Sequence, residues 1–169
     1  MTMIRALELA RPPAAPDATD EVTLPYDERY RRRAVLTTAA GEQVLMDLAE
    51  TRELADGDVL LLEDGRGLRI RAAPEPLCEV RAAPDQPLAR LAWHIGNRHT
   101  PCAVAEDRLL IRRDHVLEDM LMRLGARLSH LEAPFTPEGG AYGHGRTHGH
   151  HHGHSAHDDP NAHIPHRHA

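Results

Sequence analysis

The sequence predicts an α+β protein in three parts: a strand-rich N-terminal domain, a domain that mixes strands with helices, and a disordered tail. Three observations support this prediction. Short apolar runs separated by turns fill roughly the first 70 residues. Helical spacing of apolar residues begins only after two prolines, Pro74 and Pro76. Finally, ten of the 14 histidines fall between His144 and His168, among glycines and polar residues.

The N-terminal half is expected to form strands joined by turns. Four strands are predicted there, at 33–38, 43–48, 59–62 and 68–72. The last two flank a loop containing Asp64 and Gly65, a dipeptide typical of hairpins. The final strand alternates apolar and charged side chains, with Leu68, Ile70 and Ala72 against Arg69 and Arg71. One face of this strand should therefore be buried.

Pro74 and Pro76 mark a predicted domain boundary, with domains at 1–75 and 76–142. Proline restricts its own backbone and that of the residue before it, so the pair favours an extended linker. The remaining segment, 143–169, has too few apolar residues to offset the entropy lost on ordering. It is predicted to be a disordered tail.

The second domain should begin with a strand and a helix. Strands are predicted at 77–81, 102–105, 108–112 and 127–131. The first helix is expected to have Asp85 as its N-cap, Pro87 in its first turn and Gly96 just past its end. Its apolar stripe is formed by Leu88, Leu91, Ala92 and Ile95.

A second helix is predicted between Asp114, as its N-cap, and Gly125, at its C-terminus. Glu118 and Asp119 would lie near the positive end of its dipole. The residues expected on its buried face are Val116, Leu117, Met120, Leu121 and Leu124. The resulting order β-α-β-β-α-β is that of a ferredoxin-like fold.

Composition excludes several classes of protein. With 26 acidic residues against 20 arginines and no lysine, the formal net charge is −6, which makes nucleic acid an unfavourable partner. The sequence has no apolar stretch near the 18 or so residues that span a bilayer. Its two cysteines, Cys78 and Cys102, are too far apart for a Cys-x-x-Cys zinc ribbon and are expected to be buried free thiols. We expect a soluble cytoplasmic protein.

The histidine-rich tail predicts metal binding. Neutral imidazole offers a lone pair near neutral pH, and closely spaced imidazoles chelate nickel, copper or zinc. The alternatives are a purification tag, which would be a more uniform run, and a solvated tail that only gains charge on acidification. Its histidines are His144, His148, His150, His151, His152, His154, His157, His163, His166 and His168.

Only four histidines precede the tail: His94, His99, His115 and His130. His99 falls in the loop after the first predicted helix, where it could reach a ligand. One histidine is not a metal site, so His99 needs other side chains or a second copy of itself across a two-fold axis. Taken alone, a structural or merely exposed His99 is the simpler interpretation. His94 is interpreted as a surface or supporting residue, and His130 as structural.

Three stretches precede the histidine-rich end: HIGNRHTP at 94–101, DHVLEDML at 114–121 and PFTPEGGAY at 134–142. Together with that end, they resemble the UreE family of nickel metallochaperones for urease maturation. The resemblance covers the second domain and the tail closely, and the first half only in general layout. It implies an N-terminal domain that engages partner proteins and a ferredoxin-like metal domain that forms a homodimer.

The resemblance also implies which residues bind nickel. His99 of each subunit would share one ion at the dimer interface, and His115 corresponds to a secondary metal-binding histidine. Some relatives carry another histidine two residues earlier, where this chain has Arg113, which has no lone pair. For His115, an ordinary histidine in the first turn of a helix is the alternative. Cys102 could offer a thiolate, but burial in the following strand is the favoured reading.

By this resemblance the protein delivers nickel to the urease accessory GTPase and the apo-urease complex, with zinc or copper able to compete. The alternative is a nonspecific reservoir for nickel, zinc or copper, in which the folded part only anchors the tail. A metal-dependent hydrolase is the third class. The sequence lacks His-Glu-x-x-His, Gly-x-Ser-x-Gly and a phosphate-binding glycine loop, so no catalytic residue is predicted and an enzyme is not expected.

Overall fold

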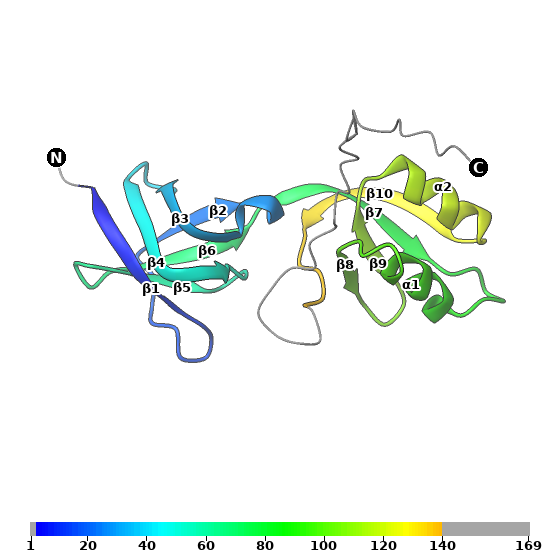
Figure 1. Cartoon of the computed structure of the whole chain (residues 1–169), viewed down its shortest axis with the longest axis horizontal. Helices are drawn as coiled ribbons and strands as arrows, with labels where there is room; N and C mark the ends of the chain where they lie inside the picture. Colours follow the sequence, from blue (N-terminus) through cyan, green and yellow to red (C-terminus); the bar gives the residue numbers. More distant parts are fainter. Residues whose placement is uncertain (1–2, 140–169) are drawn as a thin grey trace, which may run out of the picture.

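The computed structural model describes residues 3–139, which form two β-sheets in succession along the chain (Figure 1). The predicted tail and its ten histidines lie outside these residues. The N-terminal elements are β1 (Ile4–Ala10), β2 (Asp20–Leu24), the 3-10 helix η1 (Tyr26–Glu28), β3 (Tyr30–Thr37), β4 (Gln43–Glu53), β5 (Val59–Leu62) and β6 (Gly67–Ala72). The two predicted hairpins are present as β3–β4 and β5–β6.

The N-terminal sheet has the strand order β2-β6-β5-β1-β4-β3. The two predicted hairpins are antiparallel, whereas β1 pairs with β4 and β2 with β6 in parallel. The two strands of each parallel pair are separated by other strands along the chain. A connection of this length can return the chain to the same end of the sheet, as parallel pairing requires, whereas a tight turn cannot. The sheet also curls: the N–H of Ala39, after β3, donates to the carbonyl of Glu21 in β2 at 2.8 Å.

One hydrophobic core fills the inside of this curled sheet. The alternation predicted in β6 is confirmed, because Leu68, Ile70 and Ala72 are buried and Arg71 is exposed. The hairpin turn before β6 places Gly65 at φ +86°, a conformation that glycine adopts without strain. The core residues are Ala6, Val22, Leu24, Leu36, Val44, Met46, Leu48, Leu54, Leu60, Leu62, Leu68 and Ile70.

The C-terminal sheet has the topology expected of a ferredoxin-like fold. Its elements are β7 (Pro74–Arg81), α1 (Leu88–Gly96), β8 (Cys102–Val104), β9 (Leu109–Arg112), α2 (His115–Arg123) and β10 (Arg127–Pro134). The strands lie in the order β10-β7-β9-β8, and all neighbours are antiparallel. The predicted order β-α-β-β-α-β and the α+β fold class are confirmed.

Both helices pack on the same face of this sheet. Leu91 and Ile95 of α1 and Leu117 and Leu121 of α2 join one buried cluster with strand residues such as Ile111. The side chain of Asp114 accepts from the N–H of Leu117 at 2.9 Å, which confirms the predicted N-cap of α2.

Four helix details were predicted wrongly: Asp85 as N-cap, Pro87 in the first turn, Gly96 beyond the end of α1, and Val116 on the buried face of α2. Asp85 is not the N-cap of α1, because Pro87 holds the N-cap position with ψ 134° and restricts the residue before it, so the helix begins only at Leu88. Gly96 is the last residue of α1 and not the first beyond it. Val116 is 59% exposed, because its position on α2 falls to one side of the stripe formed by Leu117 and Leu121.

The two sheets meet at a small apolar junction. Tyr26 of η1, Leu77 of β7 and Phe135, just after β10, form one buried cluster, with the Tyr26 and Phe135 rings edge to face at 5.2 Å. The buried guanidinium of Arg29 donates to the carbonyl of Phe135. Figure 1 shows β7 leaving this junction and continuing into the C-terminal sheet, where its first residue, Pro74, pairs with Pro134 of β10.

Candidate metal centre

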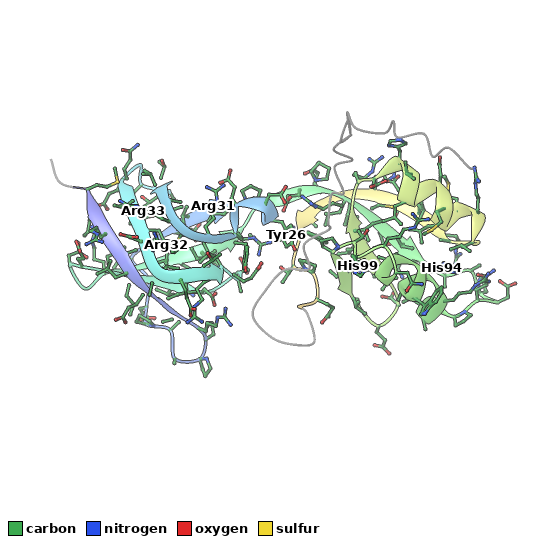
Figure 2. The ribbon with its side chains drawn as sticks, viewed as in Figure 1. Tyr26, Arg31, Arg32, Arg33, His94 and His99 are labelled. Carbon is green, nitrogen blue, oxygen red and sulfur yellow. The ribbon has the colours of Figure 1, made fainter. Side chains whose placement is uncertain are left out.

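His99 lies on the turn that ends α1, and its side chain is exposed. The backbone keeps helix-like hydrogen bonds to that point: the N–H of Arg98 donates to Ile95 and the N–H of His99 to Gly96. His99 then adopts φ +53°, the left-handed conformation that commonly terminates helices. Histidine is one of the non-glycine residues enriched there, and Pro101 two residues later prevents the helix from resuming. Figure 2 labels His99 in the C-terminal sheet domain.

Two shallow grooves are lined by neighbours of His99 in the chain, Arg98 in one and Thr100 in the other, although His99 itself lines neither. The first, of about 330 Å³, runs between Arg98 and the side of α2 that carries Val116, Asp119, Met120 and Arg123. In it, Nε of Arg98 lies 3.0 Å from Sδ of Met120. The second lies between Thr100 and Pro101 on one side and 112–114 on the other. The His99 loop therefore stands between two open surfaces, and the exposed Val116 makes the first of them partly apolar.

His115 is the first residue of α2 and is exposed. Its imidazole is attached to a rigid element, because Asp114 caps the helix directly before it. Arg113 does not chelate beside it, and Nε of Arg113 instead donates to Oε1 of Glu118 at 2.8 Å. Arg113 thus forms an ion pair within the domain.

The other two histidines of the described chain have different surroundings. His94 is half-buried on α1, and its ring meets that of the exposed Trp93 edge to face at 5.0 Å. His130 lies in β10 with about half of its side chain exposed, and its Nε2 is 2.9 Å from Oε2 of Glu118. His130 is therefore held in place by a carboxylate.

The sequence did not reveal the role of Glu118. Sequence alone predicts only a favourable charge near the start of a helix, yet Glu118 is 7% exposed and contacts Arg113, His130 and the N–H of Asp114. Burial alone would raise the pKa of Glu118, but these hydrogen bonds outweigh burial and hold the pKa below its ordinary value.

The two thiols lie in one row across the sheet. Cys78 of β7 pairs with Ile111 of β9, and Ile111 pairs with Cys102 of β8. Cys78 is wholly buried, as predicted, whereas Cys102 is only partly buried. Burial raises the pKa of each thiol to about 11, so both are protonated at neutral pH.

Within residues 3–139, one group of three or more potential metal ligands lies close together: Cys78, Glu118 and His130. His99 and His115, the ligands predicted in this part of the chain, are not members of that group. The register of β7 and β10, which places Cys78 opposite His130, would have been the signal for it. Register between strands so far apart in sequence cannot be read from the sequence.

Comparison with known proteins supplies the family. Residues 3–73 match the family model described as the UreE urease accessory protein, N-terminal domain, and residues 75–168 match the corresponding C-terminal domain.

No helix of the described segment, 3–139, is long and apolar enough to cross a membrane.

Several relatives carry the name urease accessory protein UreE. That of Ruegeria pomeroyi is 59% identical over 131 residues, which are 78% of this chain and 86% of the relative. That of Paracoccus denitrificans is 60% identical over 127 residues, 75% of this chain and 79% of the relative. That of a Chelativorans species is 54% identical over 151 residues, or 89% of both proteins. These matches cover both sheets, and the chain belongs to the UreE family of urease accessory proteins.

Proposed function

We propose that this protein is a cytoplasmic metallochaperone that binds nickel and delivers it for assembly of the urease active site. The observation that carries the proposal is the exposed imidazole of His99, on a left-handed turn at the end of α1, in a chain of the UreE family. An exposed ring beside a partly apolar groove is suited to meeting the same ring of a second subunit.

The proposed cargo site forms between two subunits. A single imidazole binds divalent metal weakly, and nickel needs four or more donors. His99 and its symmetry mate would supply two of these donors, and His115, the tail histidines or water would occupy the remaining coordination positions. The exposed Val116, beside Arg98 and Met120, gives the homodimer an apolar surface next to this site.

Imidazole ligands suit transfer. A site of neutral histidines without thiolates holds nickel less tightly than a closed cysteine-rich site, so the ion can pass to the accessory GTPase and the apo-urease complex. The tail histidines would raise the local supply of nickel, although zinc and copper compete for the same ligands. His115 would be a secondary ligand, because Arg113 gives it no chelating neighbour.

Calorimetric titration with nickel tests the proposal. A chain ending at Gly143 should bind one tight nickel per dimer, and His99→Ala should abolish that site without changing the fold, since His99 is exposed. His115→Ala should weaken binding less, and His94→Ala is the control because the His94 ring contacts Trp93 edge to face.

The alternative, a nonspecific reservoir, predicts another result. Apo-urease would then be activated equally well by the His99→Ala protein, and the chain ending at Gly143 would show no tight nickel site that depends on His99. Either result would contradict delivery through His99.

A further inference from the structure

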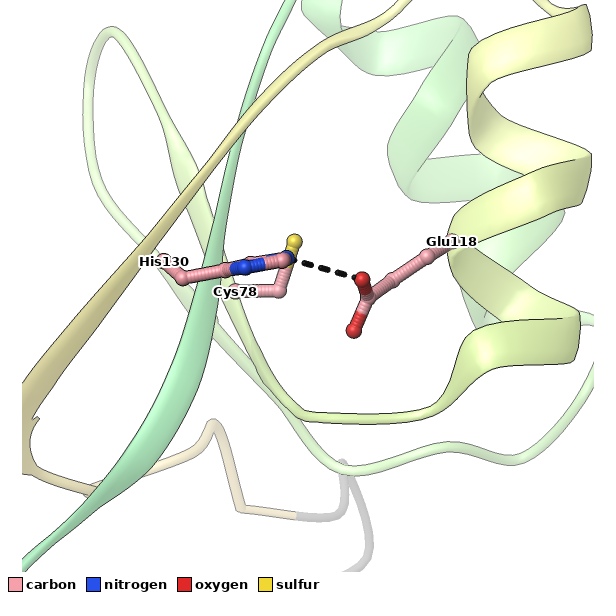
Figure 3. A group of neighbouring side chains, drawn as sticks. All are labelled: Cys78, Glu118 and His130. Atoms are coloured by element: carbon pink, nitrogen blue, oxygen red, sulfur yellow. Dashed lines mark hydrogen bonds and ion pairs between the residues drawn. The ribbon is translucent and has the colours of Figure 1, made fainter.

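A second cluster of ligating side chains lies away from the His99 loop. Cys78 comes from β7, His130 from β10 and Glu118 from α2 (Figure 3). Cys78 and His130 are directly paired across the two strands, so their side chains emerge on the same face of the sheet. Sγ of Cys78, Nε2 of His130 and a carboxylate oxygen of Glu118 all lie within 4.8 Å of one another.

The carboxylate of Glu118 is already oriented by other groups. Its Oε1 accepts from Nε of Arg113 at 2.8 Å and from the N–H of Asp114 at 3.2 Å. Its Oε2 is turned toward His130. Carboxylate ligands of metals are commonly held in this way, with one oxygen fixed by hydrogen bonds and the other directed to the ion.

We propose that Cys78, Glu118 and His130 form a second metal site, separate from His99, for a thiophilic divalent ion of the zinc and nickel class. Sulfur, imidazole nitrogen and carboxylate oxygen are the donors that such ions take in proteins. A tetrahedral ion with bonds of about 2.0–2.3 Å places its ligands roughly 3.3–3.8 Å apart. The three donor atoms, all within 4.8 Å of one another, lie close to that spacing.

Charge also balances in this site. The thiol of Cys78 gives its proton to solvent when the metal binds, and the thiolate and the Glu118 carboxylate together neutralise a 2+ ion. His130 contributes the lone pair of a neutral ring, and Arg113 remains paired with the other oxygen of Glu118. The ion thereby replaces the Glu118–His130 contact without leaving a buried charge uncompensated.

The site is open on one side. Cys78 is wholly buried, whereas 51% of the His130 side chain is exposed. Three protein ligands leave the fourth position of a tetrahedral ion for a water molecule or an incoming ligand, an arrangement that permits exchange. A closed structural site would have used a fourth side chain.

Cobalt(II) added to the full-length protein tests this proposal. A thiolate bound to cobalt gives an intense charge-transfer absorption in the near ultraviolet, which histidine and carboxylate sites do not give. Cys78 and Cys102 are the only thiols in the chain, so the histidine-rich tail cannot produce the signal. With cobalt in excess of the tail's capacity, we expect one thiolate-bound cobalt per subunit, displaced by zinc.

Variants assign the signal to its ligands. Cys78→Ser should abolish it and Cys102→Ser should retain it. His130→Ala removes a half-exposed ring, so the fold should persist, checked by circular dichroism, while cobalt affinity at this site falls at least about tenfold. His99→Ala should leave the signal unchanged, which separates this site from the proposed nickel delivery site. Absence of the absorption in the unmodified protein, its loss in Cys102→Ser, or its full retention in His130→Ala would overturn the proposal.

Discussion

Arg112 of β9 donates a hydrogen bond of 2.7 Å to the carboxylate of Asp27 in η1, and so connects the two sheets at their junction. The same guanidinium lies 5.3 Å from the centre of the Tyr26 ring. Tyr26 in turn packs on Phe135. A polar contact at the surface thus covers an apolar cluster beneath it, and the two should contribute unequally to stability.

Phe135→Ala should lower the free energy of unfolding by about 3–5 kcal/mol, because it removes a wholly buried ring from the junction. Arg112→Gln is the matched comparison. It breaks an ion pair whose partners are 39% and 70% exposed, so we expect a loss below about 1 kcal/mol. Urea denaturation of both variants measures the difference. Equal losses would mean that the apolar cluster does not hold the junction.

Asp58→Asn should make the protein more stable at pH 7. Asp58 is 2% exposed, and burial raises the pKa of its carboxyl above the ordinary value of 3.8, against the opposing effects of the Ala55 N–H and Arg11. The folded state therefore binds this proton more tightly than the unfolded state, and stability falls as the pH rises through the raised pKa. The advantage of the asparagine variant should disappear below about pH 3.8.

Asp47→Asn provides the control of opposite sign. The hydrogen bond from Arg5, 2.7 Å long, lowers the pKa of the Asp47 carboxyl. The ionised carboxylate therefore stabilises the folded protein above pH 3.8, and this stabilisation is lost as the pH falls through the lowered pKa. This variant should unfold at lower urea than the unmodified protein at pH 7. Urea midpoints measured from pH 3 to 7 test both signs, and parallel pH profiles for the two variants would contradict them.

Val116→Glu should dissociate the proposed homodimer. Val116 is 59% exposed beside Arg98 and Met120, and a carboxylate in place of its apolar side chain would have to lose its hydration when this surface is buried, which opposes association. Met122→Glu is the control, since Met122 is 54% exposed on the same helix but does not line this groove. Light scattering gives the mass of each variant. A dimeric Val116→Glu protein would place the interface elsewhere.

Ending the chain at Gly143 should remove most of the nickel that the protein holds, while the two sheets remain folded. All ten tail histidines are then absent, and none of them belongs to the described sheets. Equilibrium dialysis of the full and shortened chains measures the bound equivalents. If both bind the same number of ions, the tail does not act as a nickel store.

Mild acidification should release nickel from the tail. Unperturbed imidazole titrates near pH 6.5, and protons compete with metal for the same lone pair. Lowering the pH from about 7.5 to about 5.5 should therefore free most of the tail-bound ions. Dialysis at the two pH values follows the release. Undiminished binding at the lower pH would indicate carboxylate ligands.

The local features of the fold were predictable because they depend on few residues. Asp114 caps α2, and Gly125 follows this helix with φ +87°, as its sequence indicates. The alternation in β6 identified its buried face. These signals are short, and neighbouring residues suffice to produce them.

The features that the sequence did not predict depend on contacts between distant parts of the chain. The parallel pairing of β1 with β4 depends on how the whole sheet curls, and no turn sequence between the two strands indicates it. Glu118 became buried because β10 places His130 against α2. His99 could be predicted as a candidate ligand from the sequence because it lies in a recognisable motif. The cluster of Cys78 and His130 could not be predicted, because only the strand register brings these two residues together.

The row formed by Cys78, Ile111 and Cys102 has a chemical consequence under oxidising conditions. With one strand between them, the two Cα atoms are about 10 Å apart, beyond the roughly 7 Å that a disulfide can bridge. The two cysteines of one subunit therefore cannot form a disulfide bond while the sheet is intact. Oxidants reach Cys102 before Cys78, because Cys102 is only partly buried and Cys78 has no exposed surface.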